Sequence, residues 1–102
     1  MNLRGILVNS LDSTLESAKR KIERGEVISA ITLLKAAARW FAKDARPWRL
    51  LGICHGICED HKSAQLAFME AVEIGCADID VANLITTFWA TQESKRGLEI
   101  LQ

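Results

Sequence analysis

The sequence predicts an all-α domain, and three observations carry that prediction. Apolar residues recur at steps of three and four along nearly the whole chain of 102 residues, which is the period of an amphipathic helix. The chain has 1 Pro and 6 Gly, too few for an all-β domain with its many turns. Short polar breaks separate the periodic stretches, so neighbouring helices are expected to run antiparallel.

The first periodic stretch extends from Leu3 to Ile22. Ser13 and Glu16 have the spacing of a capping box, so this helix either begins there or runs on from Leu3. Gly25 and Glu26 break the pattern, and a second helix is predicted over 27–41.

Arg46-Pro47 marks the next boundary, because Pro is tolerated in the first turn of a helix and disfavours helix in the residue before it. A third helix is predicted over 48–58 and a fourth over 63–74, with Gly75 as its C-cap. A fifth is predicted over 79–91, with 92–96 as its polar exit. A sixth begins at Leu98 and is not completed.

Composition excludes several classes of protein. At 49% hydrophobic residues, the chain can bury enough surface to be ordered, and its length leaves room for one core. Its 3 cysteines and lack of a secretory signal argue against a disulfide scaffold. No stretch approaches the ~20 apolar residues of a membrane-spanning helix. A net charge of zero argues against a protein that works by gripping nucleic acid or acidic lipid.

The zero net charge hides an asymmetry between the two halves of the chain. Residues 1–51 contain 10 basic and 5 acidic residues, whereas residues 52–102 contain 3 basic and 8 acidic residues. Part of the basic excess is a run that includes Lys35, Arg39, Arg46 and Arg49. It lacks the interleaved aromatic residues that stack on bases, so a solvated face or the attraction of an acidic protein partner is favoured over nucleic acid.

A repeat with an offset of 34 residues relates Ala30 to Ala64, Leu34 to Phe68 and Ala37 to Ala71. Within the second copy, the sequence reads Trp48-x2-Leu51-Gly52-x2-His55, then Ala64-x3-Phe68 and Ala71. This pattern resembles the tetratricopeptide (TPR) repeat, with His55 in place of Tyr and Cys76 in place of the final Pro.

The resemblance implies antiparallel helix-turn-helix repeats stacked in a short right-handed solenoid. The whole chain, 1–102, would be a single domain. It would divide into an N-terminal segment (1–10), repeat one (11–44), repeat two (45–78) and an incomplete repeat three (79–102).

Four residues invite a metal-site interpretation, because Cys54, His55, Cys58 and His61 lie close together on or beside one predicted helix. Cys54 takes a small buried position of the repeat and His55 an inward aromatic one, so packing is favoured over metal binding. A reactive Cys/His pair would need an exposed electropositive thiolate, which this acidic surrounding does not supply. Carboxylates are nowhere paired on an apolar face, and there is no Gly-rich phosphate loop. We therefore expect no enzyme activity, catalytic residue, metal or cofactor.

The TPR resemblance implies a concave groove lined by the first helix of each repeat. Three apolar residues expected there, Leu50, Ile53 and Ile57, are needed neither for the repeat pattern nor for solubility, and so predict a protein-binding site. The alternative is that the segment 3–8 folds back and fills the groove. Gly56 would let a partner backbone approach closely. The full set of predicted groove residues is Leu15, Lys19, Ile22, Arg46, Arg49, Leu50, Ile53, Gly56, Ile57, Asn83, Leu84 and Thr87.

A narrower resemblance rests on Arg24-Gly25-Glu26-Val27 and on Leu51-Gly52-Ile53-Cys54. These stretches look like the opening repeats of the translocator chaperones of bacterial type III secretion. In size, the chain is closer to the small TPR-like co-chaperones of needle and export-gate components. The resemblance implies a protein of the bacterial cytoplasm that holds a helical or extended segment of another protein, such as a secretion substrate or needle component.

The competing interpretation is a TPR scaffold without chaperone activity, or a segment that self-associates. The incomplete third repeat would leave Ile85, Phe88, Trp89, Ile100 and Leu101 without a capping helix, so this C-terminal edge predicts a homo-oligomer or a missing remainder of the array.

Overall fold

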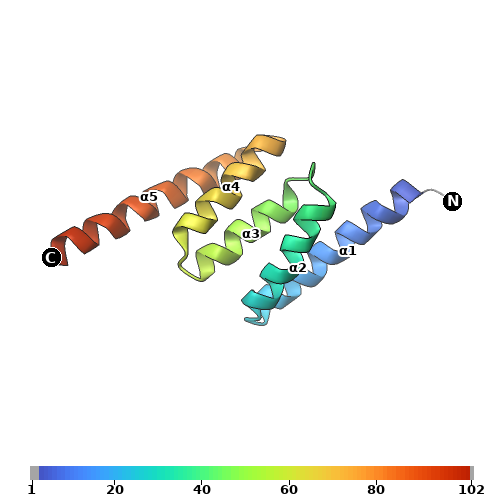
Figure 1. The fold of residues 1–102 in the computed structure, drawn as a ribbon, viewed down its shortest axis with the longest axis horizontal. Helices are drawn as coiled ribbons and strands as arrows, with labels where there is room; N and C mark the ends of the chain where they lie inside the picture. The colour runs from blue at the N-terminus through green and yellow to red at the C-terminus, as the bar shows by residue number, and fades with distance from the viewer. Residues whose placement is uncertain (1–2, 102) are drawn as a thin grey trace.

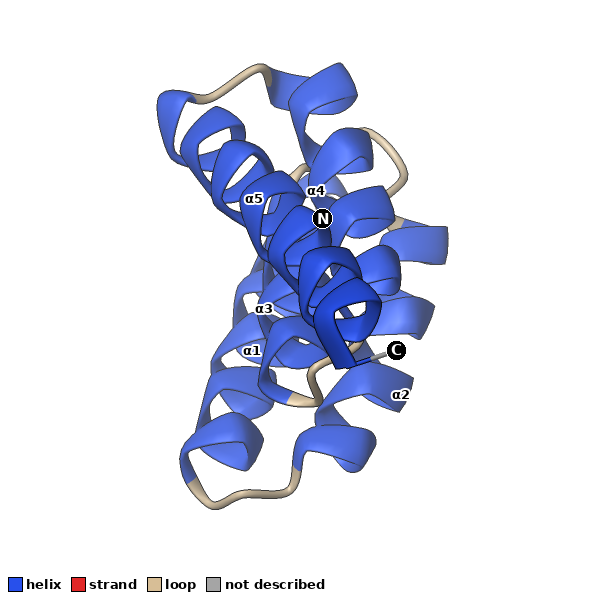
Figure 2. Cartoon of the chain, turned by 90° about the vertical axis from the view of Figure 1, so that its left-hand side faces the viewer, coloured by secondary structure: helices blue, strands red, loops and turns tan. Residues whose placement is uncertain are grey.

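The computed structural model describes the backbone of residues 3–101 and the side chains of residues 10–92. The described chain contains no strand and folds into five helices: α1 (Leu3–Glu23), α2 (Val27–Trp40), α3 (Arg46–Ile57), α4 (His61–Gly75) and α5 (Asp78–Leu101) (Figure 1, Figure 2). The all-α prediction is thereby confirmed. Predictions that involve Met1, Asn2 and Gln102, or the side chains of Ile100 and Leu101, fall outside what the structure describes.

Successive helices run antiparallel and form a slab of 62 × 29 × 18 Å (Figure 1). Each helix packs against the next one in the sequence, and α1 also contacts α3. The helix α3 therefore lies in the middle, with neighbours on both sides.

The helix α1 is continuous from Leu3, so Ser13 does not start it. Glu16 pairs with Lys19, with 3.4 Å between Nζ and Oε1, instead of closing a capping box. The stretch 3–8 does not fold back over the predicted groove, because it continues α1 away from the other helices (Figure 1).

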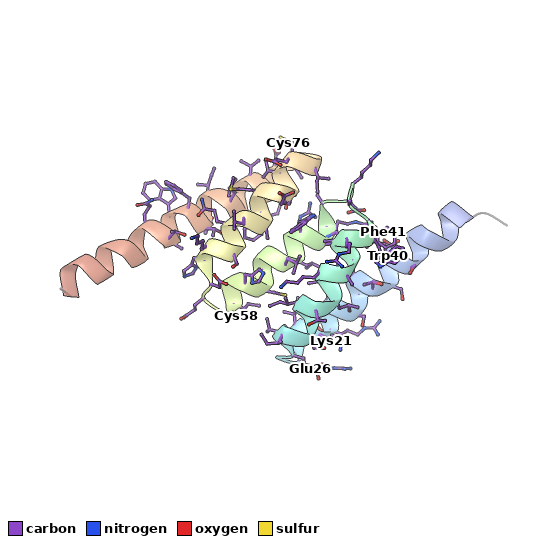
Figure 3. The ribbon with its side chains drawn as sticks, in the orientation of Figure 1. Lys21, Glu26, Trp40, Phe41, Cys58 and Cys76 are labelled. Atoms are coloured by element: carbon purple, nitrogen blue, oxygen red, sulfur yellow. The ribbon has the colours of Figure 1, made fainter. Side chains whose placement is uncertain are left out.

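The turns before α2 and α3 form where the sequence predicts them. Gly25 has a φ of +81°, a left-handed conformation that favours glycine, and Lys21 pairs with Glu26 across this turn at 3.9 Å (Figure 3). Pro47 lies in the first turn of α3. The carboxylate of Asp44 accepts a hydrogen bond from the backbone N–H of Arg46 at 2.9 Å, which satisfies a donor at the helix start.

The helix α4 is longer at both ends than predicted. Asp60 caps its first turn by accepting a hydrogen bond from the Ser63 N–H at 3.2 Å, so the polar residues before Ser63 are already helical. The prediction of Gly75 as C-cap is wrong: Gly75 is the last helical residue, and Cys76 takes the left-handed conformation at φ +48°. The Cys76 N–H still donates to the Val72 carbonyl at 2.8 Å, which extends the helical hydrogen bonding by one residue.

The predicted sixth helix does not exist as a separate element. The helix α5 runs without interruption through 92–96 to Leu101. The stretch 92–96 is polar but consists mainly of Gln, Glu, Lys and Arg, which favour helix almost as strongly as Ala. Polarity there ends the apolar stripe without ending the helix.

The core is built where small residues let helices approach closely. An ideal Cβ on Gly52 of α3 would lie 2.5 Å from Cε1 of Phe68 in α4, so the Phe68 ring occupies the space that any other residue would need. Alanines fill the remaining close contacts between helices. The main buried cluster consists of Leu11, Leu15, Ala18, Ala30, Ile31, Leu34, Ala37, Ala38, Leu51, Cys54 and Ala67.

Candidate functional site

A cleft of about 560 Å³ lies between α1 and α3, on the side where the groove is predicted. Five predicted groove residues come together in it. We call it the α1–α3 cleft, and its lining consists of Asp12, Leu15, Glu16, Lys19, Arg46, Arg49 and Leu50.

Beyond this cleft, the same face of α3 continues as an open apolar stripe. Leu50, Ile53 and Ile57 share that face, because residues three, four and seven apart lie on one side of a helix. Ile53 is 39% exposed and Ile57 is 52% exposed. Nothing lies within 4 Å of an ideal Cβ on Gly56, so this part of α3 is uncovered.

The remaining predicted groove residues are placed elsewhere. Ile22 packs against the core cluster. Thr87 is buried, and its hydroxyl donates to the Asn83 carbonyl at 2.8 Å. Leu84 lines a pocket of about 330 Å³ between α4 and α5, together with Met69 and Phe88.

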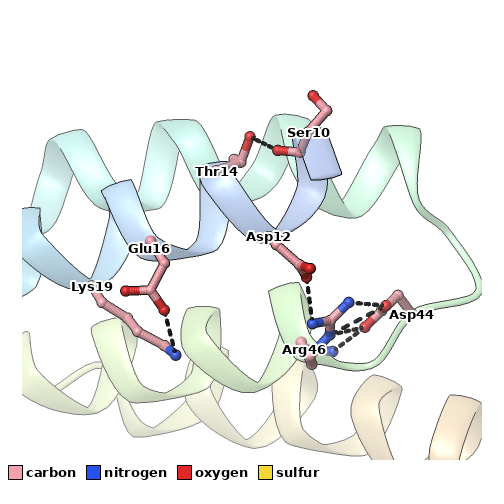
Figure 4. Close-up of polar contacts among 7 residues, drawn as sticks. All are labelled: Ser10, Asp12, Thr14, Glu16, Lys19, Asp44 and Arg46. Atoms are coloured by element: carbon pink, nitrogen blue, oxygen red, sulfur yellow. Dashed lines mark hydrogen bonds and ion pairs between the residues drawn. The ribbon is translucent and has the colours of Figure 1, made fainter. Parts of the chain in front are cut away.

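Arg46 links α1 to the turn before α3 (Figure 4). Its Nη1 donates to Asp12 at 2.9 Å, and its Nη2 donates to Asp44 at 2.8 Å. The hydrogen bond from Arg46 is the main cause that lowers the pKa of Asp44 below its ordinary value, and the same contact raises the pKa of Arg46.

Arg49 links α3 to α5 through a buried carboxylate. Its Nε donates to Oδ1 of Asp80 at 2.7 Å and its Nη2 donates to Oδ2 at 2.9 Å. The Asp80 side chain is fully buried, and the hydrogen bond that Arg49 donates to Asp80 is the main cause that raises the pKa of Arg49.

The charges that line the α1–α3 cleft are therefore paired within the protein. The sequence presents Arg46 and Arg49 as cations that would attract an acidic partner, whereas the structure holds each on carboxylates. Lys19 is paired with Glu16. The surface that stays available to a partner on this side of the molecule is therefore the apolar stripe of Ile53 and Ile57.

The Cys and His residues near the end of α3 are distributed over different environments. Cys54 is buried in the core, and burial is the main cause that raises the pKa of its thiol, with a smaller contribution from Cys58. Cys58 and Cys76 are exposed at opposite ends of α4 (Figure 3). Among the described residues, no group of three or more His, Cys, Asp or Glu side chains is placed to hold a metal ion.

A second cleft, of about 660 Å³, lies on the other side of α3, between α2 and α4. The sequence alone does not predict this cleft, because Lys35 and Arg39 belong there to a basic run that is interpreted as a solvated face or as a surface that attracts an acidic protein partner. Two signals were available: pairs with helical spacing on both walls, Lys35/Arg39 and Leu66/Glu70, and the replacement of an inward aromatic residue by His55. We call it the α2–α4 cleft, and its lining consists of Lys35, Ala38, Arg39, Trp48, Leu51, His55, Ser63, Leu66, Ala67 and Glu70.

Comparison with known proteins does not assign the chain to a family. Neither a scan against protein-family models nor a search of curated proteins finds a match. None of the helices in residues 3–101 combines the length and apolar character needed to cross a membrane.

Proposed function

We propose that this protein is a TPR-like interaction module that binds a segment of another protein on the concave side of a short right-handed solenoid. The observation that carries the proposal is the half-exposed apolar stripe of Ile53 and Ile57, which continues the α1–α3 cleft along one face of α3. Adjacent exposed apolar side chains that continue a cleft are typical of a surface that a protein partner covers.

The TPR-like arrangement is supported by the order of the elements and by one contact. Two helical hairpins, α1–α2 and α3–α4, are followed by α5. Gly52 lies against Phe68, and these residues occupy the small and the bulky positions of the repeat pattern.

The occupant is proposed to be an amphipathic helix or an extended segment that presents apolar side chains. The charges beside the stripe are already paired, so apolar contact supplies most of the affinity. Gly56 leaves space for a partner backbone to approach α3 closely.

The biological role that fits best is a small chaperone or adaptor of bacterial type III secretion, acting in the cytoplasm. Its support is the sequence resemblance over Arg24–Val27 and Leu51–Cys54. An aggregation-prone secretion substrate or needle component would need the kind of apolar cover that the stripe provides.

The test begins with purification from the native cell, identification of the co-eluting protein and reconstitution with the purified partner. The double substitution Ile53→Asp/Ile57→Asp should abolish binding in isothermal titration calorimetry while leaving helicity by circular dichroism unchanged. A matched control is Ile28→Asp/Ile79→Asp, because both side chains are exposed to at least the same degree, 71% and 53%, on other helices. Equal binding by the two variants would exclude the groove as the site.

A second candidate is a TPR scaffold or self-associating segment, and the exposed apolar residues of α5 favour it. Ile85, Phe88 and Trp89 are exposed, and the Phe88 and Trp89 rings meet edge to face with centroids 6.3 Å apart. Met69 of α4 is also exposed beside them, at the pocket between α4 and α5.

Sedimentation equilibrium tests this second candidate. Self-association through α5 requires that Phe88→Glu/Trp89→Glu be monomeric at concentrations where the wild type is not. Trp40→Glu is the control, because Trp40 is an exposed tryptophan at the end of α2 (Figure 3). A wild type that stays monomeric would rule out self-association.

A further inference from the structure

The α2–α4 cleft uses the opposite side of α3 from the α1–α3 cleft. Trp48, Leu51 and His55 line it, whereas Arg46, Arg49 and Leu50 line the other. At 100° per residue the two sets lie about half a turn apart. A ligand in one cleft therefore leaves the other accessible.

The floor of the α2–α4 cleft is apolar, and part of that surface is open. Trp48 and Leu51 of α3 line it together with Ala38 of α2 and Ala67 of α4. On the α4 wall, Leu66 is 58% exposed. An apolar side chain that enters here would contact both an aromatic ring and an exposed leucine, as the anchor residues of helix-in-groove complexes do.

The rim of this cleft differs in charge from the α1–α3 cleft. Lys35 and Arg39 are exposed on the α2 wall, and no ion pair or side-chain hydrogen bond joins either of them to another residue in the part of the chain that the structure describes. Glu70 lies on the facing α4 wall. The cleft thus has a cationic wall and an anionic wall with an apolar floor between them.

We propose that the α2–α4 cleft binds an amphipathic helix of a partner protein that carries two carboxylates four residues apart beside an apolar stripe. Lys35 and Arg39 are separated by four residues, or about 6 Å along α2. Carboxylates at the same spacing on the partner can face both cations at once. Glu70 repels a carboxylate on the opposite wall, so only one orientation of the partner helix matches the charges of both walls.

The test uses a tryptophan reporter that the chain already contains. The chain has 3 tryptophans; Trp40 and Trp89 are exposed, so the Trp40→Phe/Trp89→Phe background keeps the core and leaves Trp48 in the cleft as the sole tryptophan. The probe is an alanine-based peptide of about 16 residues, long enough to form a helix, with two Glu four apart and Leu on the adjacent face. A second peptide has Lys in place of both Glu.

The acidic peptide should change Trp48 emission in a saturable manner, and the basic peptide should bind at least about tenfold more weakly. Charge reversal by Lys35→Glu/Arg39→Glu should weaken the acidic peptide by a similar factor. The matched control is Arg20→Glu/Arg24→Glu, which makes the same change in net charge at the same spacing on exposed positions outside both clefts. This control and Ile53→Asp/Ile57→Asp should both bind as the background protein does.

Three results would overturn the proposal. One is the absence of a saturable Trp48 response to the acidic peptide. Another is that Lys35→Glu/Arg39→Glu and the Arg20/Arg24 control weaken binding of the acidic peptide equally, because the effect would then come from net charge and not from the cleft. The third is a dimer by sedimentation equilibrium that Lys35→Glu/Arg39→Glu dissociates, which would make a second copy of the chain the occupant. Because the Ile53/Ile57 variant is tested alongside, failure here is distinguishable from failure of the α1–α3 site.

Discussion

The guanidinium of Arg49 lies against the buried carboxylate of Asp80 with two parallel hydrogen bonds of 2.7 and 2.9 Å. Arg49 belongs to α3 and Asp80 to the first turn of α5, so the pair joins two helices that have α4 between them in the sequence. A fully buried carboxylate needs such a partner, because desolvation without pairing is costly.

Removing Arg49 should destabilise the fold strongly. Arg49→Met leaves the Asp80 carboxylate buried without a cation, at a cost of about 3–5 kcal/mol in the free energy of unfolding. The double variant Arg49→Met/Asp80→Leu should recover most of that loss, because two apolar side chains need no pairing. Urea unfolding monitored by circular dichroism measures both. If the double variant is no more stable than the single one, the pair is not the cause.

Two glycines of α3 should respond in opposite directions to the same substitution. Gly52→Ala forces a Cβ against the Phe68 ring and should cost about 1–3 kcal/mol. Gly56→Ala meets open space and should stabilise the helix by up to about 1 kcal/mol. Thermal or urea unfolding of both variants checks this, and equal effects would show that Phe68 does not confine Gly52.

The contribution of Asp44 should depend on pH in the acidic range. Because the hydrogen bond from Arg46 lowers the pKa of Asp44 in the folded state, the ionised carboxylate stabilises the protein at all pH values well above 3.8. That stability begins to disappear below pH 3.8 and is gone once the pH is below the folded-state value. Asp44→Asn should therefore cost about 1 kcal/mol near neutral pH and progressively less in acid. Urea unfolding of the wild type and of this variant at several pH values measures the difference, and a loss that stays constant into acid would show that the ionised Asp44 carboxylate is not its cause.

The three cysteines should differ in reactivity. Cys58 and Cys76 are exposed and should react with N-ethylmaleimide in the native protein, whereas burial and the raised pKa of Cys54 should protect it. Mass spectrometry should show two rapid additions and a third only after denaturation. Three rapid native additions would place Cys54 outside the core.

The sequence was sufficient to predict the core side of the helices but not all their ends. Gly25 and Pro47 define their turns by backbone chemistry, so those boundaries could be predicted. The end of α5 could not, because the residues at 92–96 interrupt an apolar stripe while favouring helix. Cys76 could not either, since a left-handed cysteine has no sequence signal comparable to glycine.

For the candidate sites, the sequence predicts which residues share one face of a helix, but not which residues of different helices contact each other. Ile53 and Ile57 could be assigned to one face of α3 from their spacing, and the TPR resemblance implies that this face lines an open groove. The pairing of Arg49 with Asp80 could not be predicted, because it depends on how α5 packs beside α3 and the two residues are 31 positions apart. The α2–α4 cleft could not be predicted for the same reason, because its two walls come from α2 and α4, which are not consecutive in the sequence.

The elongated arrangement of the helices also affects how the mass of the protein in solution should be measured. The radius of gyration is 15.2 Å, whereas a compact domain of this length has about 13 Å. An 11.3 kDa monomer of this shape has more hydrodynamic drag than a sphere of equal mass and elutes early in size-exclusion chromatography. Elution volume alone would therefore overestimate the mass of a monomer, and a shape-independent mass from light scattering is the appropriate standard.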